Sequence, residues 1–557
     1  MTQPITTSIK IALAQLNPLV GDLAGNAQKL IKARTEAAAQ GADLVLFTEL
    51  FITGYPPEDL VRKPAFAAAA RAQTEALAAV TADGGPGVIV GTIWPDEGKV
   101  YNSVALLDGG RVAAVRHKVD LPNYGVFDEK RVFDVGPLPG PLNFRGARLG
   151  VPICEDIWKD EVTECLQETG SEILLVPNGS PFDWPKPEMR MNVVVARVTE
   201  TGLPLVYLNQ VGGQDELVFD GASFVLNADR QLAVQLPAWE EALAMVDFRR
   251  TPAGWKADIG ARAPLEAGEA SAYHACVLGL RDYVDKNGFP GVVLGLSGGI
   301  DSALVAALAT DALGPARVHC VMLPYRYTSN ASLADAAACA EALGVRYDIV
   351  PIAEPVEGFA RALAKTFAGA PPGIAEENIQ SRVRGTTLMA ISNKFGAMVL
   401  TTGNKSEMSV GYATLYGDMN GGFNPIKDLY KMEVYRLARW RNANVPKGGK
   451  GPGGVVIPEN ILTKAPSAEL RENQTDQDSL PPYEALDDIL ECLVEKEMPL
   501  AGIVARGHDV ATVKKVERLL YLAEYKRRQA APGVKISSRN FGRDRRYPIT
   551  NKFREQI

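Results

Sequence analysis

The chain has 557 residues, of which 46% are hydrophobic and 22% charged. This composition is typical of a globular protein and excludes a disordered, collagen-like or coiled-coil chain, and the length predicts at least two domains. The formal net charge of −7 leaves no basic excess for a nucleic-acid backbone, and no apolar run reaches the ~18–20 residues of a membrane span. We therefore expect neither nucleic acid nor a membrane as a partner.

The cysteines and histidines limit the chemistry. None of the six cysteines forms a CxxC pair, so we expect free thiols in a reducing cytoplasm. The four histidines exclude an HExxH motif and make a Cys2His2 zinc site implausible. Carboxylates and lysine are therefore the expected acid–base groups.

The first half of the chain alternates strands and helices. A helix is expected over 26–40, and a hairpin over 100–118 turns at the sequence DGG. The other strands are expected at 9–17, 42–50, 87–94, 147–154, 172–177, 203–209 and 221–227. This order predicts a layered α/β sandwich.

The pattern lapses over 249–268, which is the best candidate for a linker. We place the domain boundary inside it, giving domains of residues 1–262 and 263–557. The second half begins with a helix near Ser271 and then GVVLGLSGGIDSALVAALAT at 291–310, a strand, a glycine turn and a helix. Further strands are expected at 317–324, 345–352 and 397–404. Strand–helix alternation of this kind predicts a doubly wound parallel sheet.

The hexapeptide SGGIDS at 297–302 is the sharpest motif, because it lies between the end of a strand and the first turn of a helix. Gly298 and Gly299 let the backbone approach phosphate oxygens. Ser297 and Ser302 offer hydroxyls, and Asp301 implies a Mg²⁺ ion between its carboxylate and the phosphates. GxxxxGK[ST] is absent, so a Walker-type ATPase is disfavoured.

Three polar residues of the first half stand at strand ends in apolar contexts, namely Glu49, Lys118 and Cys154. Separately, each is most often a rim ion pair or a small core residue. Together, at three strand ends, they predict one catalytic site.

This pattern resembles the nitrilase (carbon–nitrogen hydrolase) superfamily over residues 7–250, which implies an α-β-β-α sandwich and a Glu-Lys-Cys triad. In that resemblance Glu49 is the general base, Cys154 the nucleophile and Lys118, rather than Lys130, faces the oxyanion. Glu129 matches a second glutamate that orients the site. The sequences YGVFDEKRVF and NGSPFDWPK resemble a glutaminase branch. The L-glutamine-binding residues implied by this match are Tyr124, Ser180 and Lys186.

The second half resembles the ATP pyrophosphatase family, and over residues 270–557 its closest resemblance is to NAD synthetases. The resemblance implies an adenine nucleotide alpha-hydrolase-like fold and gives three sets of site residues. The ATP-binding set is Ser297, Gly298, Gly299, Ile300, Asp301, Ser302, Thr402, Lys431 and Ser467. The set for nicotinate adenine dinucleotide (deamido-NAD) is Asn378, Arg382, Glu407 and Lys535. The Mg²⁺ ligands are Asp301 and Glu407.

Together the two halves resemble the glutamine-dependent NAD(+) synthetases. The resemblance implies a ligase that uses L-glutamine, ATP and deamido-NAD with Mg²⁺, and passes ammonia along a sheltered route. We expect a cytoplasmic homo-oligomer. The segment 445–458 is either a mobile loop that couples the two sites or a surface insertion. The alternatives are another glutamine-fed adenylating amidotransferase and a nucleotide-sensing module with a retired amidase domain.

Overall fold

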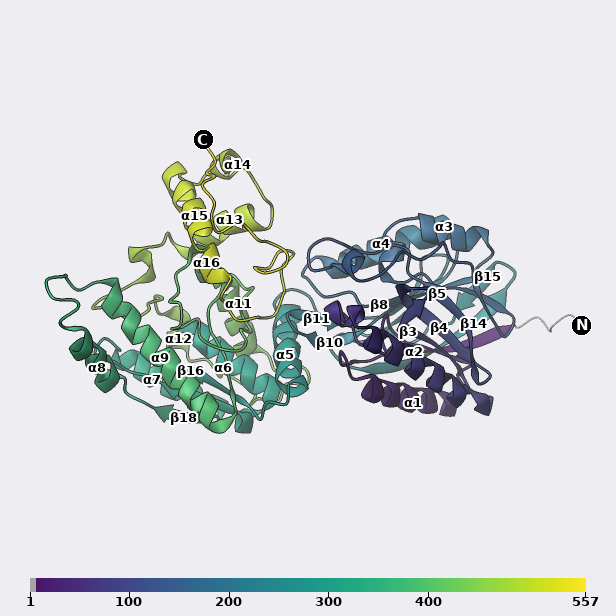
Figure 1. Cartoon of the computed structure of the whole chain (residues 1–557), viewed down its shortest axis with the longest axis horizontal. Helices are drawn as coiled ribbons and strands as arrows, with labels where there is room; N and C mark the ends of the chain where they lie inside the picture. The colour runs from purple at the N-terminus through teal and green to yellow at the C-terminus, as the bar shows by residue number, and fades with distance from the viewer. Residues whose placement is uncertain (1–6, 557) are drawn as a thin grey trace, which may run out of the picture. The chain divides into compact units, whose positions relative to one another are not determined.

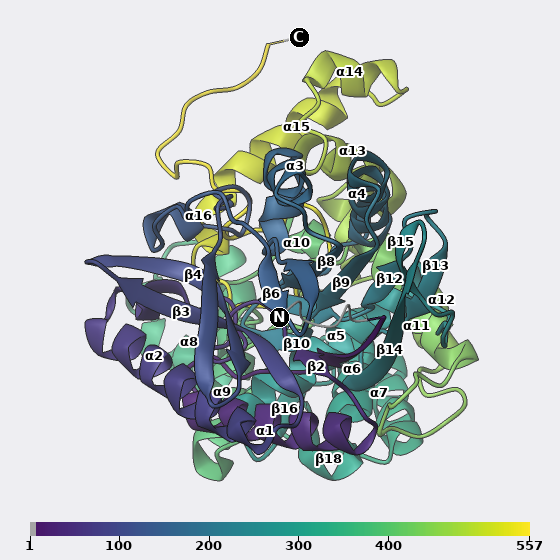
Figure 2. The same cartoon turned by 90° about the vertical axis from the view of Figure 1, so that its right-hand side faces the viewer.

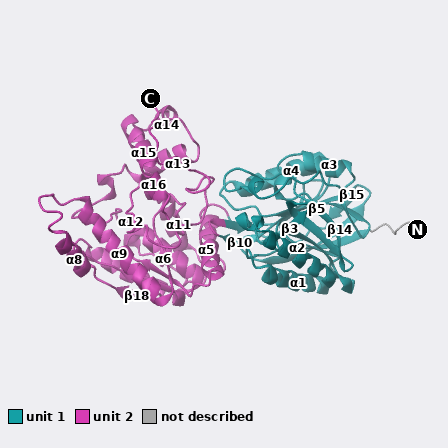
Figure 3. Cartoon of the chain, viewed as in Figure 1, with its two compact units in different colours: residues 1–214, 218–266 teal, residues 215–217, 267–557 magenta. Residues whose placement is uncertain are grey.

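The structure is a computed structural model that describes residues 7–556. It divides into two compact units (Figure 3). The first contains the described residues up to 214 together with 218–266. The second contains 215–217, which are the turn after strand β10 and the first residue of strand β11, together with the described residues from 267 onward. Each unit is described by itself.

The first unit is built on two sheets whose strands are visible in Figures 1 and 2. The seven-stranded sheet has the order β15-β14-β1-β2-β3-β4-β5, and the six-stranded sheet has the order β13-β12-β9-β8-β7-β6. The strands of the first sheet are β1 Ser8–Gln15, β2 Leu44–Leu46, β3 Gly87–Asp96, β4 Lys99–Asp108, β5 Arg111–His117, β14 Ala242–Thr251 and β15 Gly254–Ala257. Those of the second are β6 Leu142–Phe144, β7 Ala147–Gly150, β8 Ile173–Asn178, β9 Leu205–Asn209, β12 Phe224–Leu226 and β13 Leu232–Gln235. A separate pair is formed by β10 Val211–Gln214 and β11 Leu217–Asp220.

Alternation along the strands explains the layers. Ile11 of β1 belongs to the core between the two sheets, and its neighbour Ala12 faces the helices outside, because successive strand side chains point to opposite faces. Helices α1 Leu23–Ala39 and α2 Pro64–Ala78 cover the seven-stranded sheet. Helices α3 Glu161–Glu168 and α4 Lys186–Thr201 cover the six-stranded one. The predicted α-β-β-α sandwich is thereby confirmed.

The predicted linker is wrong over its first part. Residues 249–257 form the hairpin of β14 and β15, with Arg250 opposite Trp255 in an antiparallel ladder. The polar run Arg249–Thr251 hides the end of β14 in the sequence, while Trp255 of the edge strand β15 is buried. The irregular connection is shorter and ends where helix α5, Glu269–Lys286, begins.

The second unit has a four-stranded sheet in the order β18-β17-β16-β19, and all three strand pairs are parallel. The predicted parallel sheet is thereby confirmed. Its strands are β16 Val292–Gly295, β17 Val318–Met322, β18 Arg346–Ile349 and β19 Met398–Val399. The helices around it are α6 Ile300–Leu313, α7 Asn330–Leu343, α8 Ala353–Leu363, α9 Ile374–Phe395, α10 Lys405–Val410, α11 Lys431–Ala443 and α12 Glu459–Thr463. The last helices are α13 Tyr483–Val494, α14 Leu500–Ala505, α15 Val510–Leu522 and α16 Glu524–Arg527.

The glycine- and lysine-rich segment 445–458, expected to be a mobile loop, is irregular but anchored. The backbone N–H of Lys450 donates to the carbonyl of Asp311 at 2.8 Å. The N–H groups of Val456 and Ile457 both donate to Asn442 Oδ1 at 3.0 Å, and both side chains are buried. Its glycines therefore shape a packed turn.

Within residues 7–556, no helix is both long and apolar enough to cross a bilayer.

Candidate active sites

The first candidate site surrounds Cys154. This residue begins a short 3-10 helix, Cys154–Ile157, with φ at 48°, and only 5% of it is exposed. A left-handed conformation is costly for a residue with a side chain and is found where the surrounding structure holds it for function. The strand predicted over 147–154 is therefore shorter than expected, because β7 ends at Gly150 and Cys154 begins a turn.

Lys118 is the centre of the site and lies between two carboxylates. Its Nζ atom is 2.7 Å from Glu49 Oε1, 2.9 Å from Glu129 Oε2 and 3.0 Å from Glu129 Oε1. The side chains of Lys118 and Glu49 are fully buried. The structure thus brings together all four predicted catalytic residues, since Cys154 interacts electrostatically with each of the other three.

Further hydrogen bonds fix the two carboxylates. The amide of Asn102 donates to Glu49 Oε1 at 2.8 Å and reaches Glu129 Oε2 at 3.5 Å. Tyr55 donates its hydroxyl to Glu129 at 2.8 Å, and the N–H of Gly179 donates to Glu49 Oε2 at 2.9 Å. Every carboxylate oxygen therefore has a partner, so the acids cannot rotate away from the lysine.

The electrostatics follow from this burial. Burial and the nearby charge of Glu49 raise the pKa of the Cys154 thiol well above its usual value, so the sulfur is protonated at rest. Burial opposes the charge of Lys118, but Glu129 and Glu49 raise its pKa well above the usual value. The lysine therefore stays positive, and the thiol needs a base to become a nucleophile.

Asp156 connects the two segments that carry the lysine and the cysteine. Its carboxylate accepts the backbone N–H groups of Val119 and Asp120 just after Lys118, and that of Ile153 just before Cys154, at 2.7–3.0 Å. Burial raises the pKa of Asp156 to about 7, against the pull of these donors. Sequence reasoning missed Asp156, Asn102 and Tyr55. The sequence did offer a signal for Asn102 and Asp156, because each is a polar residue inside an apolar stretch.

Two of the three predicted glutamine-binding residues, Tyr124 and Lys186, contact side chains that follow Cys154 in the chain. Tyr124 donates its hydroxyl to the carboxylate of Glu155 at 3.0 Å, next to Cys154 in the chain. Lys186 Nζ lies 4.9 Å from the ring centre of Trp158, and burial lowers its pKa. Ser180 is buried, and its hydroxyl accepts from Arg190 Nε at 3.2 Å.

The second candidate site is the glycine turn before helix α6. Gly298 has φ at 77°, and a Cβ on it would lie 2.4 Å from the carbonyl oxygen of Ser332, so any other residue is excluded there. The hydroxyls of Ser297 and Ser302 are 3.1 Å apart, and Ser302 donates to the carbonyl of Gly299. The turn thus opens the N-terminal end of α6 toward a pocket, where an anion is favoured.

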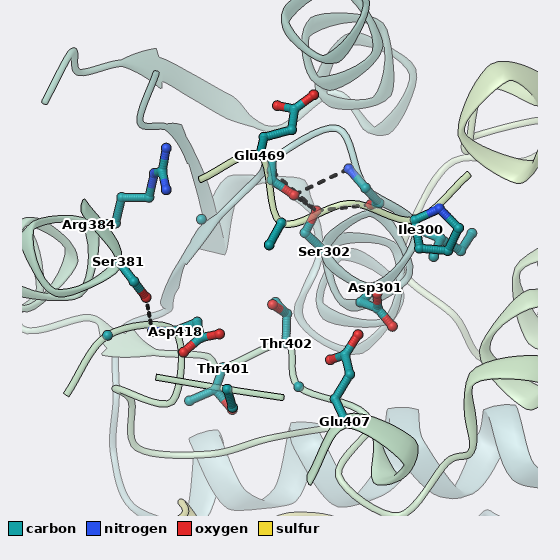
Figure 4. Close-up of a pocket in the computed structure, with 18 of the residues that line it drawn as sticks. Ile300, Asp301, Ser302, Ser381, Arg384, Thr401, Thr402, Glu407, Asp418 and Glu469 are labelled. Atoms are coloured by element: carbon teal, nitrogen blue, oxygen red, sulfur yellow. Dashed lines mark hydrogen bonds between the residues drawn. The ribbon is translucent and has the colours of Figure 1, made fainter. Parts of the chain in front are cut away.

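That pocket has a volume of about 310 Å³ (Figure 4). All the predicted ATP-binding residues except Gly298 line it, and so does Glu407. Asn378, Arg382 and Lys535, predicted to bind the dinucleotide, are not among its lining residues. Asn378 accepts from the Thr414 hydroxyl, Arg382 donates to the Leu415 carbonyl, and Lys535 pairs with Asp544 at 3.2 Å.

At the floor of the pocket, a lysine again lies between two carboxylates. Lys431 Nζ is 2.5 Å from Asp301 Oδ2 and 3.0 Å from Glu407 Oε1. Asn404 donates to Asp301 Oδ1 at 2.8 Å. Burial opposes the charge of Lys431, but Asp301 and Glu407 raise its pKa. Burial raises the pKa of Glu407, although the positive charge of Lys431 acts in the opposite direction.

Two carboxylates of this pocket are suited to Mg²⁺. The described residues contain no group of three or more His, Cys, Asp or Glu side chains that could hold a metal ion. Asp301 and Glu407 supply two carboxylates that converge beside the phosphate turn. Mg²⁺ is commonly held by one or two carboxylates with substrate phosphates and waters completing the octahedron. The residues therefore fit a metal that arrives with a nucleotide.

Five charged residues that line this pocket were given no role from the sequence: Arg384, Asp418, Lys464, Glu469 and Asp476. Asp476 is buried and accepts the Tyr483 hydroxyl at 2.8 Å, while its other oxygen has no hydrogen-bond partner. Figure 4 shows Arg384 and Asp418 on the side of the pocket away from Asp301. No motif spacing predicts these residues, because they come from separate parts of the chain, such as α9 for Arg384 and a short 3-10 helix for Asp476.

Each of the two candidate sites lies in a part of the chain that matches a different known family. Residues 10–254 match the carbon–nitrogen hydrolase family, and residues 272–530 match the NAD synthase family. The class defined by fold and site is therefore an amide-cleaving domain joined to an NAD synthase domain.

Full-length relatives define the family more narrowly. The chain is 56% identical over 553 residues to a glutamine-dependent NAD(+) synthetase of Rhodobacter capsulatus, covering 99% of this chain and 100% of that one. A Thermotoga maritima enzyme of the same name is 43% identical, over 99% of this chain and 100% of that one. A solved glutamine-dependent NAD+ synthetase from Acinetobacter baumannii, in complex with adenosine diphosphate, is 43% identical with a TM-score of 0.77, covering 98% and 99% of the two chains. This chain belongs to the family of glutamine-dependent NAD(+) synthetases.

Proposed function

We propose that the chain converts deamido-NAD, ATP, L-glutamine and water into NAD, AMP, pyrophosphate and L-glutamate. The observation that carries this proposal is the presence, in one chain, of a buried thiol beside Lys118 and a phosphate-binding turn beside Lys431. The first releases ammonia from an amide, and the second activates a carboxylate. The enzyme is a ligase of NAD biosynthesis with glutamine as the amido donor.

In the first site, Glu49 takes the proton of the Cys154 thiol as the sulfur attacks the amide carbon of glutamine. The tetrahedral intermediate collapses to a thioester, and the proton leaves with ammonia. Water then hydrolyses the thioester to glutamate. All close partners of Lys118 are carboxylate oxygens, so it offers the developing oxyanion its charge rather than a free N–H group. Glu129 holds it there, and Tyr124, Ser180 and Lys186 bind glutamine.

In the second site, the carboxylate of deamido-NAD attacks the α-phosphorus of ATP, and pyrophosphate leaves. Ammonia then attacks the activated carbonyl carbon, and AMP leaves in place of the poor leaving group hydroxide. The turn from Ser297 to Ser302 holds the phosphates, with Thr402, Lys431 and Ser467 contacting ATP. Mg²⁺, held by Asp301 and Glu407, would neutralise phosphate charge.

Four residues are proposed to contact deamido-NAD, and three of them lie outside the pocket lining. Asn378, Arg382 and Lys535 supply polar and basic groups suited to a dinucleotide with a pyrophosphate and a carboxylate, and Glu407 lies at the pocket floor. We also propose the domain division at residues 262 and 263, a homo-oligomeric state and a cytoplasmic location. Free thiols, which all six cysteines carry, suit that compartment.

The direct test is product detection by mass spectrometry with glutamine labelled by ¹⁵N in its amide. The proposal expects ¹⁵N in the carboxamide of NAD, with AMP and pyrophosphate formed in equal amounts. ADP as the stoichiometric product would contradict the adenylation step. Incorporation of nitrogen from free ammonia but never from glutamine would contradict the role of the first site.

A further inference from the structure

Two ion pairs join helices α6 and α11, one toward each end. At the N-terminal ends, Lys431 lies 2.5 Å from Asp301 at the floor of the pocket. Ten residues further along each helix, Arg441 pairs with Asp311. Since an α-helix rises about 1.5 Å per residue, the second pair lies about 15 Å from the first along the helix axes. The two helices therefore run in the same direction, and each of the two ion pairs joins an aspartate of α6 to a basic residue of α11.

The second pair is rigid. Arg441 Nε lies 2.6 Å from Asp311 Oδ2 and Nη2 lies 3.0 Å from Oδ1, so both prongs of the guanidinium are engaged. The side chains are 0% and 1% exposed. Tyr273 of α5 donates its hydroxyl to the same carboxylate at 2.6 Å. A two-pronged contact fixes orientation as well as distance, which a single bond does not.

The anchored segment 445–458 closes over this pair. Arg441 Nη2 donates to the Pro452 carbonyl at 2.6 Å, and a Cβ on Gly451 would lie 2.2 Å from Asp311 Oδ1. The segment thus completes the hydrogen bonds of a buried guanidinium and needs glycine to approach it. The conformation of this segment therefore depends on the ion pair between Asp311 and Arg441.

Stability alone does not account for such a pair, because replacing a buried ion pair with apolar residues is often neutral or stabilising. Unlike a two-pronged ion pair, an apolar contact does not fix the relative orientation of the two side chains. We propose that Asp311 and Arg441 are positioning residues, which fix the register of α11 against α6 and so hold Lys431 beside Asp301. This inference rests on the proposed function to the extent that Lys431 and Asp301 act on ATP.

The test uses full-length variants. Arg441→Lys keeps the positive charge but loses the two-pronged contact of the guanidinium with Asp311. Asp311→Leu/Arg441→Met/Tyr273→Phe replaces the cluster with apolar groups of similar size. For both, kcat of ammonia-dependent NAD formation and the rate of pyrophosphate–ATP exchange with deamido-NAD are expected to fall about 10- to 100-fold per folded molecule. KM for deamido-NAD should change less than about threefold, and glutamine hydrolysis should persist.

Arg436→Lys is the matched control, because Arg436 of α11 makes an exposed ion pair with Glu269 of α5 at 3.0 Å. It should leave both rates within about twofold of the wild type. The proposal is overturned if the Arg441 variants keep wild-type rates, or if their loss matches the fraction of unfolded protein. It is equally overturned if neither variant folds, because the pair then maintains the fold rather than the site. A wild-type chain that consumes ATP without forming NAD would instead contradict the proposed function, and the pair would then be judged on ATP consumption.

Discussion

The two candidate sites contain the same arrangement of charges in different surroundings. Each has a buried lysine between two carboxylates: Lys118 with Glu49 and Glu129, and Lys431 with Asp301 and Glu407. In the first, Asn102, Tyr55 and Gly179 occupy the remaining carboxylate positions, and the neighbour is a thiol. In the second, both carboxylates are 17% exposed and face a pocket beside a phosphate-binding turn.

The difference shows that a charge triad does not define a reaction by itself. A triad whose oxygens are all satisfied keeps a fixed geometry and suits proton transfer to and from an adjacent nucleophile. A triad whose carboxylates face a pocket can in addition contact the groups of an incoming substrate. The chemistry therefore depends on what else the carboxylates contact.

The largest expected effect separates the two sites completely. Cys154→Ala should lower glutamine-dependent NAD formation by at least about 10³-fold, because the nucleophile is lost. Ammonia-dependent formation should stay within about twofold, since the thiol acts only in ammonia release. Steady-state assays with the two nitrogen sources check this. A variant that still uses glutamine at the wild-type rate would remove Cys154 from the mechanism.

A second substitution affects the shared step. Asp301→Asn should lower NAD formation about 10²- to 10³-fold from glutamine and ammonia alike, because adenylation precedes the use of either. The Cys154 thiol should still form a glutamyl thioester, detectable as a mass increase in the intact protein. If the variant lost glutamine-dependent NAD formation but kept ammonia-dependent formation, Asp301 would not serve the common step.

The enclosed character of the first site can be tested through Asn102. Asn102→Leu keeps the size of the side chain but leaves a buried oxygen of Glu49 without one donor. This loss corresponds to about 1–3 kcal/mol, or roughly a 5- to 150-fold fall in glutaminase rate. Ser103→Ala, at the next position of β4 and on its opposite face, is the control. Equal rates for the two variants would contradict the role of Asn102.

The smallest effect concerns Glu433, a carboxylate outside both triads that pairs with Arg436 at 3.7 Å. Glu433 of α11 accepts the Tyr430 N–H at 2.7 Å, and burial raises its pKa to about 8. Between pH 4.5 and 8 the folded state then binds more protons than the unfolded state, so this group lowers stability as the pH rises. Glu433→Gln should therefore gain in Tm relative to the wild type, by a few degrees, between pH 5 and pH 8.5 in thermal melts. A constant difference across this range would contradict the assignment.

Much of this architecture was accessible from the sequence, because local signals were strong. The period-two apolar strands and the SGGIDS turn specify backbone conformation within a few residues of themselves. Glu49, Lys118 and Cys154 were recognisable as polar groups in apolar stretches. Asn102 and Asp156, which support them, also stand in apolar stretches, but their roles depend on partners distant in the chain and were not predicted. The hairpin at 249–257 was missed because β15 has only four residues and the end of β14 is the polar run Arg249–Thr251.

The burial of Cys154 also affects how the protein ages. Peroxides and alkylating reagents attack the thiolate, and attack falls steeply when a sulfur is protonated and inaccessible. With the sulfur buried and its pKa raised, the resting protein keeps its nucleophile in a form that oxidants modify slowly. Four of the five other cysteines are buried as well, so oxidation should reach the partly exposed Cys165 first. Slow loss of the glutaminase on storage in air, compared with rapid modification of Cys165, is the expected result.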